Sequence, residues 1–250
     1  MIVDWKHRKA ESEVEVLLRR AASLDPELVS TFPRPLEEIL CASLAVSFES
    51  HRGLTARVVA EVLSDVYGVN DPEVLPQEAG PIAGFSYARG ETAVVFTDTQ
   101  YGDGFERFTI AHEASHLAVE YLPRLVGARQ QSLFGATGAP AFYARRDPPA
   151  HFFFGEDSAP ARGSDLWAEY ARLRADREAW LREVVANACA AELLTPHREL
   201  GRFLRSLPSS ADHRAEVQTR FGLSRRAAEV RLADLGLAQR GDGGAQFLLG

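Results

Sequence analysis

The residues best suited to chemistry stand together in one stretch, His112-Glu113-Ala114-Ser115-His116, which has the form His-Glu-x-x-His. On a helix, positions four apart project from one face, so the two imidazoles could ligate one Zn²⁺ at about 2.0–2.1 Å. Glu113 is displaced by about 100° around the same helix. A carboxylate there lies near the metal without having to ligate it, and it could take a proton from water.

The residues around this motif predict a buried helix. Its apolar positions recur at helical spacing and are Ile110, Ala111, Ala114, Leu117, Ala118 and Tyr121. Placing two histidines and a glutamate on a buried face requires compensation for their lost hydration, which a bound metal would supply. The alternative is a helix whose two histidines lie beside a glutamate that is hydrogen-bonded within the protein, with no metal bound.

A catalytic zinc ion usually has three protein ligands, and the motif supplies two. The extended form HExxHxxGxxH is absent, because Val119 and Leu122 stand where its glycine and third histidine would be. We therefore expect the third ligand from a later helix, for which residues 166–194 have the apolar spacing. Within it Glu183 could be the ligand, and Asn187, one turn on, could hydrogen-bond the far nitrogen of a ligand histidine. Spacing alone leaves other carboxylates open: Glu120, Asp165, Glu169, Asp176, Glu178 and Glu192.

The residues before the motif predict a scaffold of helices and short strands. The expected helices are 11–22, 35–44 and 54–67, the expected strand is 45–49, and residues 82–87 and 92–97 read as a β-hairpin. A strand at the edge of a zinc cleft could hold an extended peptide by main-chain hydrogen bonds. The hairpin could equally serve only to cover the core.

Composition limits the class of protein. With 250 residues and 46 % hydrophobic residues, the chain suits one large domain, or a domain with a small module. A net charge of −7 argues against a general affinity for nucleic acid. The two cysteines are far apart, the start has no secretory pattern, and no apolar run reaches 18 residues, so we expect a cytoplasmic protein that does not engage a membrane.

Three strings of residues together resemble the ImmA/IrrE family of metallopeptidases. They are Gly84-Phe85-Ser86-Tyr87, Arg107-Phe108-Thr109-Ile110-Ala111-His112-Glu113-x-x-His116, and Glu183-x-x-Ala186-Asn187-x-x-Ala190-Ala191-Glu192-Leu193-Leu194-x-Pro196. The resemblance implies an α+β fold with a thermolysin-like (gluzincin) zinc core and a small antiparallel sheet. It also implies that His112, His116 and Glu183 ligate zinc, that Glu113 is the general base, and that Asn187 orients a ligand histidine.

The chain departs from the family pattern at two places. Cys189 replaces an aromatic residue, either as a core substitution or as a thiol near zinc. His116 and Glu183 are 67 residues apart, which predicts an insertion at about 123–164 within a metallopeptidase domain spanning 1–205. This insertion could be a flap in which His151 or Tyr143 stabilises an oxyanion, or a surface segment with its own apolar cluster.

The composition changes after Pro196, where nine arginines outnumber five acidic residues up to Arg240. Residues 212–221 and 225–235, separated by a glycine turn with Ser224 as N-cap, predict a helix-turn-helix-like module within 206–240, before a tail at 241–250. DNA contact through Arg225 and Arg226 is one interpretation. Packing of the module on the peptidase core is the one we favour.

These observations predict a cytoplasmic zinc-dependent endopeptidase, for which Mn²⁺ could substitute in vitro. The resemblance implies that its protein substrate is a helix-turn-helix transcriptional repressor, whose cleavage derepresses stress-response or mobile-element genes. Two alternatives remain open. One is a catalytically weak or inactive zinc-fold regulator that binds DNA or a repressor, and the other is a toxin–antitoxin component.

Overall fold

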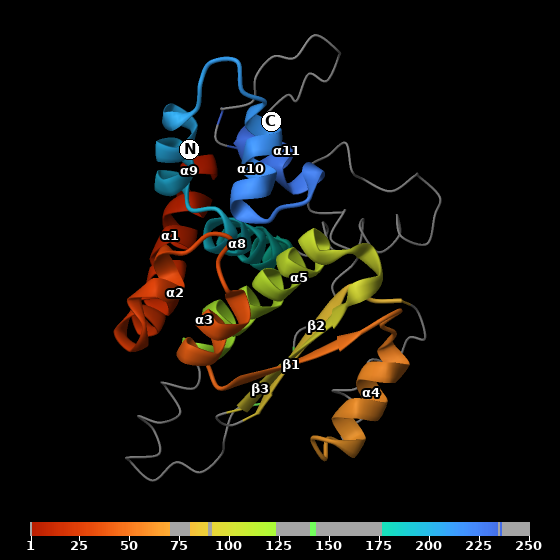
Figure 1. The fold of residues 1–250 in the computed structure, drawn as a ribbon. Helices are drawn as coiled ribbons and strands as arrows, with labels where there is room; N and C mark the ends of the chain where they lie inside the picture. Colours follow the sequence, from red (N-terminus) through yellow and green to blue (C-terminus); the bar gives the residue numbers. More distant parts are fainter. Residues whose placement is uncertain are drawn as a thin grey trace, which may run out of the picture.

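The computed structural model describes residues 2–70, 81–89, 92–123, 141–143, 177–234 and 236, and of residues 2–7, 141–143 and 177–179 it describes the backbone. Within these ranges the chain has the expected α+β class and is mostly helical (Figure 1). The helices are α1 (Ile2–Leu24), α2 (Pro26–Ser30), α3 (Leu36–Ser43), α4 (Ala56–Asp65), α5 (Asp103–His116), α8 (Arg177–Leu194), α9 (His197–Ser206), α10 (His213–Phe221) and α11 (Arg225–Asp234). The strands are β1 (Val46–His51), β2 (Gly84–Arg89), β3 (Thr92–Asp98) and β4 (Ala141–Tyr143). A 3₁₀ turn, η1 (Thr99–Tyr101), precedes α5, and a π-helical turn, η2 (Leu117–Tyr121), follows it.

The four strands form one sheet in the order β1-β3-β2-β4. The predicted hairpin is confirmed, since β2 and β3 pair antiparallel with Phe85 opposite Phe96. The prediction of an antiparallel sheet is wrong in one respect, because β1 pairs with β3 in parallel. After β1 the chain passes through α4 and returns to the sheet as β2, which is separated from β1 by one strand position. Strand β3 occupies that position. The hairpin then returns β3 alongside β1 in the same direction.

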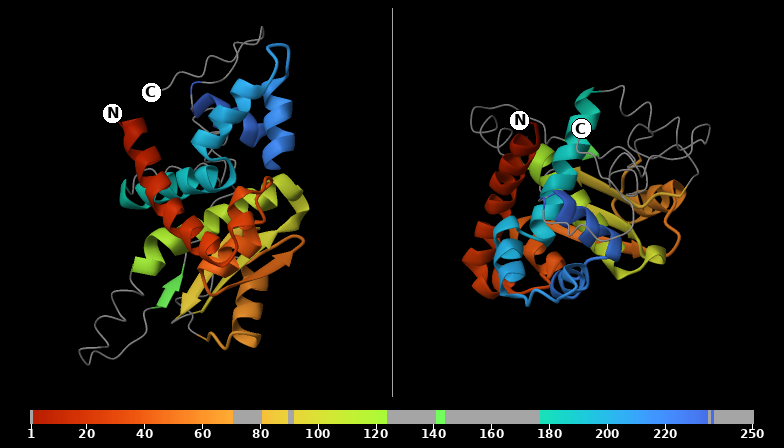
Figure 2. Two further views of the ribbon diagram at one scale, coloured as in Figure 1. Left: turned by 60° about the vertical axis from the view of Figure 1, so that its left-hand side comes forward. Right: turned by 90° about the horizontal axis from the view of Figure 1, so that it is seen from above.

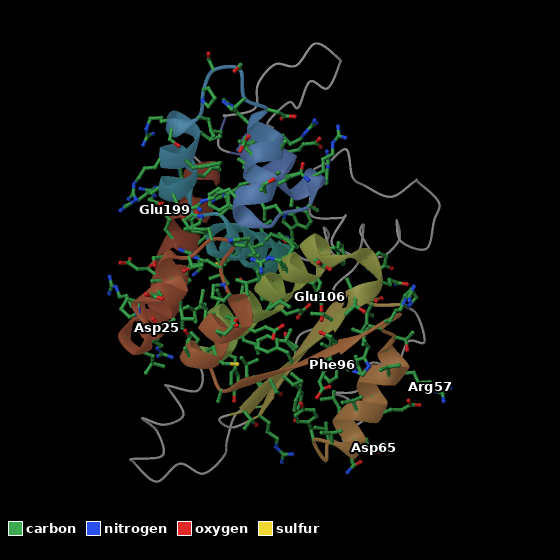
Figure 3. The ribbon with its side chains drawn as sticks, viewed as in Figure 1. Asp25, Arg57, Asp65, Phe96, Glu106 and Glu199 are labelled. Atoms are coloured by element: carbon green, nitrogen blue, oxygen red, sulfur yellow. The ribbon has the colours of Figure 1, made fainter. Side chains whose placement is uncertain are left out.

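The two faces of the sheet have different side chains, because successive residues of a strand point to opposite sides. Phe85 and Tyr87 of β2 lie with Phe96 of β3 in an apolar cluster beneath α4. Phe96 is fully buried between the sheet and α4, whereas Arg57 points outward from α4 and is 81 % exposed (Figure 3). On this face the large side chains of β2 and β3 form an apolar cluster with α4.

The opposite face of β2 is lined by small residues at alternate positions: Gly84, Ser86 and Ala88. Helix α5 packs against this face and touches both β2 and β3. Every residue of α5 from Phe108 to His116 is buried. The small residues of the strand allow the helix to approach closely, which places the His-Glu-x-x-His motif in the middle of the molecule.

Helix α8 crosses α5 on the side away from the sheet, and α1 packs along α8 (Figure 2). The main apolar core lies between these helices and α3. Helices α3 and α4, strand β1 and the C-terminal end of α8 lie within two residues of the predicted bounds, whereas α1 begins at Ile2, nine residues before the predicted helix 11–22. No helix in the described part of the chain has the length and apolar character needed to cross a bilayer.

Helices α9, α10 and α11 lie beyond α8, on the far side from the sheet (Figure 1). Helix α10 ends at Gly222, which has a φ of +64°, and the Ser224 hydroxyl accepts a hydrogen bond from Ala227 N at the start of α11 (3.2 Å). The guanidinium of Arg231 in α11 is buried and donates to Thr195 O at the end of α8 (3.0 Å from Nε). The two predicted helices are therefore present, and Arg231 joins α11 to the C-terminal end of α8, while the helix-turn-helix module, the domain boundaries and a role in binding DNA stay predictions.

Candidate metal centre

His112 and His116 of α5 and Glu183 of α8 converge at the crossing of the two helices. The three residues are buried, with exposed fractions of 4 %, 4 % and 9 % for the whole residue. The two Nε2 atoms are 3.1 Å apart, and Glu183 Oε2 lies 3.4 Å from each of them. Among the described residues these three form a group that could hold a metal ion.

The triangle of donor atoms has the size that a tetrahedral metal site requires. Two ligands at about 2.0–2.1 Å from one ion, at tetrahedral angles, lie about 3.4 Å from each other. The three edges observed here, 3.1, 3.4 and 3.4 Å, are close to that value. Three protein ligands leave a fourth position of a tetrahedral ion for water or substrate.

Hydrogen bonds on the far side of each ring fix the tautomer of both histidines. His112 Nδ1 donates to Asn187 Oδ1 (3.0 Å), and His116 Nδ1 donates to Glu120 Oε1 (2.7 Å), because both acceptors are oxygens. In a neutral imidazole whose Nδ1 carries the proton, Nε2 presents a lone pair. Both lone pairs are thus available on the side where Glu183 lies.

Glu183 supplies a negative charge to the same point. Its Oε2 atom is buried and makes no hydrogen bond within the described residues. Without a metal, burial would raise the pKa of this carboxyl, but positive charge on His116 and His112 outweighs that effect and holds the pKa well below its usual range; a bound cation would supply this charge instead and leave both rings neutral. Two lone pairs and a carboxylate oxygen that converge in a buried space fit a divalent cation, which would satisfy all three at once.

Glu113 lies on the face of α5 that meets β2, and it is 1 % exposed. Ser86 Oγ donates a hydrogen bond to Glu113 Oε2 (2.8 Å). Gly84 leaves no room for a side chain, because a Cβ at this position would lie 2.8 Å from Glu113 Oε1 and closer still to Thr109 Cγ2. Strand β2 therefore fixes the carboxylate of Glu113 on one side of α5, while α8 brings Glu183 to the two histidines.

The structure separates the rival carboxylates from the candidate ligand. Glu120 binds the far side of His116, and Glu192 pairs with Arg231 at the other end of α8. Cys189 is buried in the apolar core and is not part of the donor group, so its sulfur is no ligand there. Other predicted positions are His151, Asp165, Glu169 and Asp176, which lie outside the described residues, and Tyr143 and Glu178, for which only the backbone is described.

Three residues near the site had no predicted role of their own. Spacing places Glu120 among the possible ligands, but its position one turn after His116 equally permits a hydrogen bond to that ring. Ser86 and Gly84 belong to a motif used only for the family resemblance. Their alternation along a strand indicates a shared face, but the sequence does not say which helix that face meets.

Two comparisons address the family of the chain. A scan against models of protein families finds no match, and a search of curated proteins finds no relative.

Proposed function

We propose that the protein is a zinc-dependent endopeptidase of the ImmA/IrrE type. The observation that carries the proposal is the buried triangle of His112 Nε2, His116 Nε2 and Glu183 Oε2, with edges of 3.1–3.4 Å. Imidazole nitrogen and carboxylate oxygen are ligands that suit Zn²⁺, and two histidines with one glutamate are a ligand set of zinc peptidases. The motif resemblance supports the same reading independently of these distances.

Zinc held by these three residues would supply Lewis acidity, polarising the scissile carbonyl and lowering the pKa of water from 15.7 towards about 7. Glu113 would take the proton of the attacking water on its carboxylate and deliver it to the nitrogen of the leaving amine. The hydrogen bond from Ser86 limits the rotation of this carboxylate, so its geometry is set before substrate arrives. Asn187 and Glu120 hold the two ligand rings in the required tautomer.

The substrate we propose is a helix-turn-helix transcriptional repressor, cut within an extended segment. Strand β4 pairs with Tyr87–Arg89 of β2, and within the described residues no strand pairs with Gly84–Ser86 on that side. An extended peptide aligned there would lie beside Glu113 and could use main-chain hydrogen bonds. The repressor class itself rests on the resemblance, which also implies release of stress-response or mobile-element genes.

The test is to incubate the purified zinc-loaded protein with the helix-turn-helix repressor encoded by the neighbouring gene and to identify products by mass spectrometry. Glu113→Gln keeps the three ligands and removes the base, so we expect cleavage to fall by about 10²–10⁴-fold. Glu106→Gln is the matched control, since Glu106 lies two turns earlier on α5 (Figure 3). Equal cleavage by wild type and Glu113→Gln would refute the proposed role of Glu113. If wild type does not cleave the repressor, the proposed substrate is wrong.

A further inference from the structure

Glu120 is not part of the donor triangle, but its carboxylate contacts His116, which is. Its Oε1 atom lies 2.7 Å from His116 Nδ1, and the two side chains are 15 % and 5 % exposed. Nδ1 and Nε2 are on opposite edges of the imidazole ring, so a carboxylate on Nδ1 lies behind the ring as seen from the donor triangle. Glu120 therefore acts on the centre only through His116.

The position of Glu120 is itself fixed by a second element. Glu120 lies in the π-helical turn η2, which begins directly after His116. Glu120 Oε2 is 3.7 Å from Nε of Arg182, and Arg182 precedes Glu183 on α8. An ion pair thus joins the turn that follows the two histidines to the helix that carries the third donor.

The two ligand histidines differ in the partner of Nδ1. His112 donates to the neutral amide of Asn187 (3.0 Å), whereas His116 donates to a carboxylate at a shorter distance (2.7 Å). A hydrogen bond to a charged acceptor is stronger than one to a neutral acceptor. A carboxylate behind a ligand histidine also increases the electron-donating power of the ring, and removal of such a partner typically weakens metal binding 10- to 100-fold.

We propose that Glu120, held by Arg182, is a positioning residue that orients His116 and strengthens its Nε2 as a metal ligand. The inference rests on the proposed metal centre, but it does not depend on peptidase activity. It predicts that the charge of Glu120 matters more than its shape. Arg182 acts one step further from the metal and is 33 % exposed, so its contribution is smaller.

The experiment measures Zn²⁺ affinity of the full chain by competition with a chromophoric chelator. We expect Glu120→Ala to weaken binding by about 10- to 100-fold, Glu120→Gln by an intermediate factor, and Arg182→Gln by no more than about five-fold. Glu199→Gln is the matched control, because Glu199 is an exposed carboxylate that pairs with Arg202 on α9 (2.7 Å). Circular dichroism checks that each variant is folded.

A second measurement remains informative even if the variants are less stable than wild type. In ¹⁵N-labelled wild type, we expect a slowly exchanging His116 Nδ1–H resonance shifted downfield by its charged acceptor, and in Glu120→Gln a smaller shift. Equal Zn²⁺ affinity for wild type, Glu120→Gln and Glu120→Ala, with binding abolished in His116→Ala, would refute the role of Glu120 and leave the metal centre standing. Absence of Zn²⁺ binding by wild type would refute both.

Discussion

Gly84 of β2 lies so close to Glu113 of α5 that a methyl group at position 84 would come within 2.8 Å of the Glu113 Oε1 atom. The same methyl group would clash with Thr109 Cγ2, one turn earlier on the helix. The strand backbone and the helix are thus in contact at the carboxylate that we propose as the general base. Position 84 tolerates only glycine without a shift of one element.

Gly84→Ala tests this contact directly. We expect overpacking to lower the free energy of unfolding by about 1–3 kcal/mol, because a buried helix and strand must separate. We also expect cleavage of the repressor to fall further than the loss of folded protein explains, since Glu113 is displaced. Urea unfolding and initial cleavage rates at matched folded fractions measure the two effects.

The chain offers a rescue and a control for that change. Thr109→Ser removes the Cγ2 atom that makes the closest contact and keeps the hydroxyl that donates to Phe105 O (3.1 Å), so the double variant should recover part of the stability. Gly201→Ala in α9 should not destabilise, because its Cβ would meet only the flexible end of Arg205 at 3.4 Å. Unchanged stability in Gly84→Ala would show that the contact is not tight.

Ser86→Ala removes the hydrogen-bond donor to Glu113 Oε2. Loss of one partner of a buried charged hydrogen bond should destabilise the fold by about 1–3 kcal/mol. The Zn²⁺ content should stay at the wild-type level, because the Ser86 hydroxyl donates to Glu113, which is not one of the three proposed ligands. We expect the turnover rate to fall while zinc content, measured by inductively coupled plasma mass spectrometry, remains the same. A parallel loss of zinc would place Ser86 in metal binding instead.

Removing one ligand should abolish high-affinity metal binding. His116→Ala and Glu183→Ala each leave two donors where a closed set of three is required. Wild type should gain about 2.7 kcal/mol of stability when free Zn²⁺ reaches 100 times its dissociation constant, and the two variants should gain none. Thermal unfolding with and without Zn²⁺ or a chelator shows the difference. A zinc-induced shift of equal size in Glu183→Ala would exclude Glu183 as the third ligand.

The buried ion pair between Arg231 and Glu192 should be essential for the docking of α11 on α8. The side chains are 3 % and 11 % exposed. Arg231→Met leaves Glu192 without its buried partner, so we expect a loss of about 3–5 kcal/mol in the free energy of unfolding. Arg202→Met breaks an exposed pair with Glu199 and should change stability by less than about 1 kcal/mol. Chemical denaturation measures both losses. Equal losses in the free energy of unfolding for the two variants would show that the Arg231–Glu192 pair is not essential.

The two free cysteines should differ in reactivity. Cys41 is exposed, whereas Cys189 is buried and its burial raises the pKa of the thiol to about 12. A raised pKa means less thiolate at a given pH, so the Cys189 thiol is a poor nucleophile as well as being shielded from the reagent. Native protein should therefore release one equivalent from a chromogenic disulfide reagent and two equivalents after denaturation. Rapid release of two equivalents from the native state would contradict the burial of Cys189.

Much of the local structure follows from the amino-acid sequence. Apolar spacing predicted α4 and the buried helix of the motif, and the turn residues predicted the hairpin of β2 and β3. These features depend on neighbours within a few residues, where helix and strand periodicities act directly. The parallel pairing of β1 with β3 was not predicted, because strand order depends on the path of a connection and leaves no periodic pattern in the sequence.

The sequence by itself determined the pair His112 and His116, since positions four apart on one helix must share a face. It could not choose Glu183 over Glu120 or Glu192 from spacing, because a contact across 67 or more residues depends on how two helices cross. Tertiary packing decided that Glu183 completes the triangle, that Glu120 lies behind His116, and that Ser86 reaches Glu113. Each of these relationships joins separate turns or elements, and only the packed core fixes their distances.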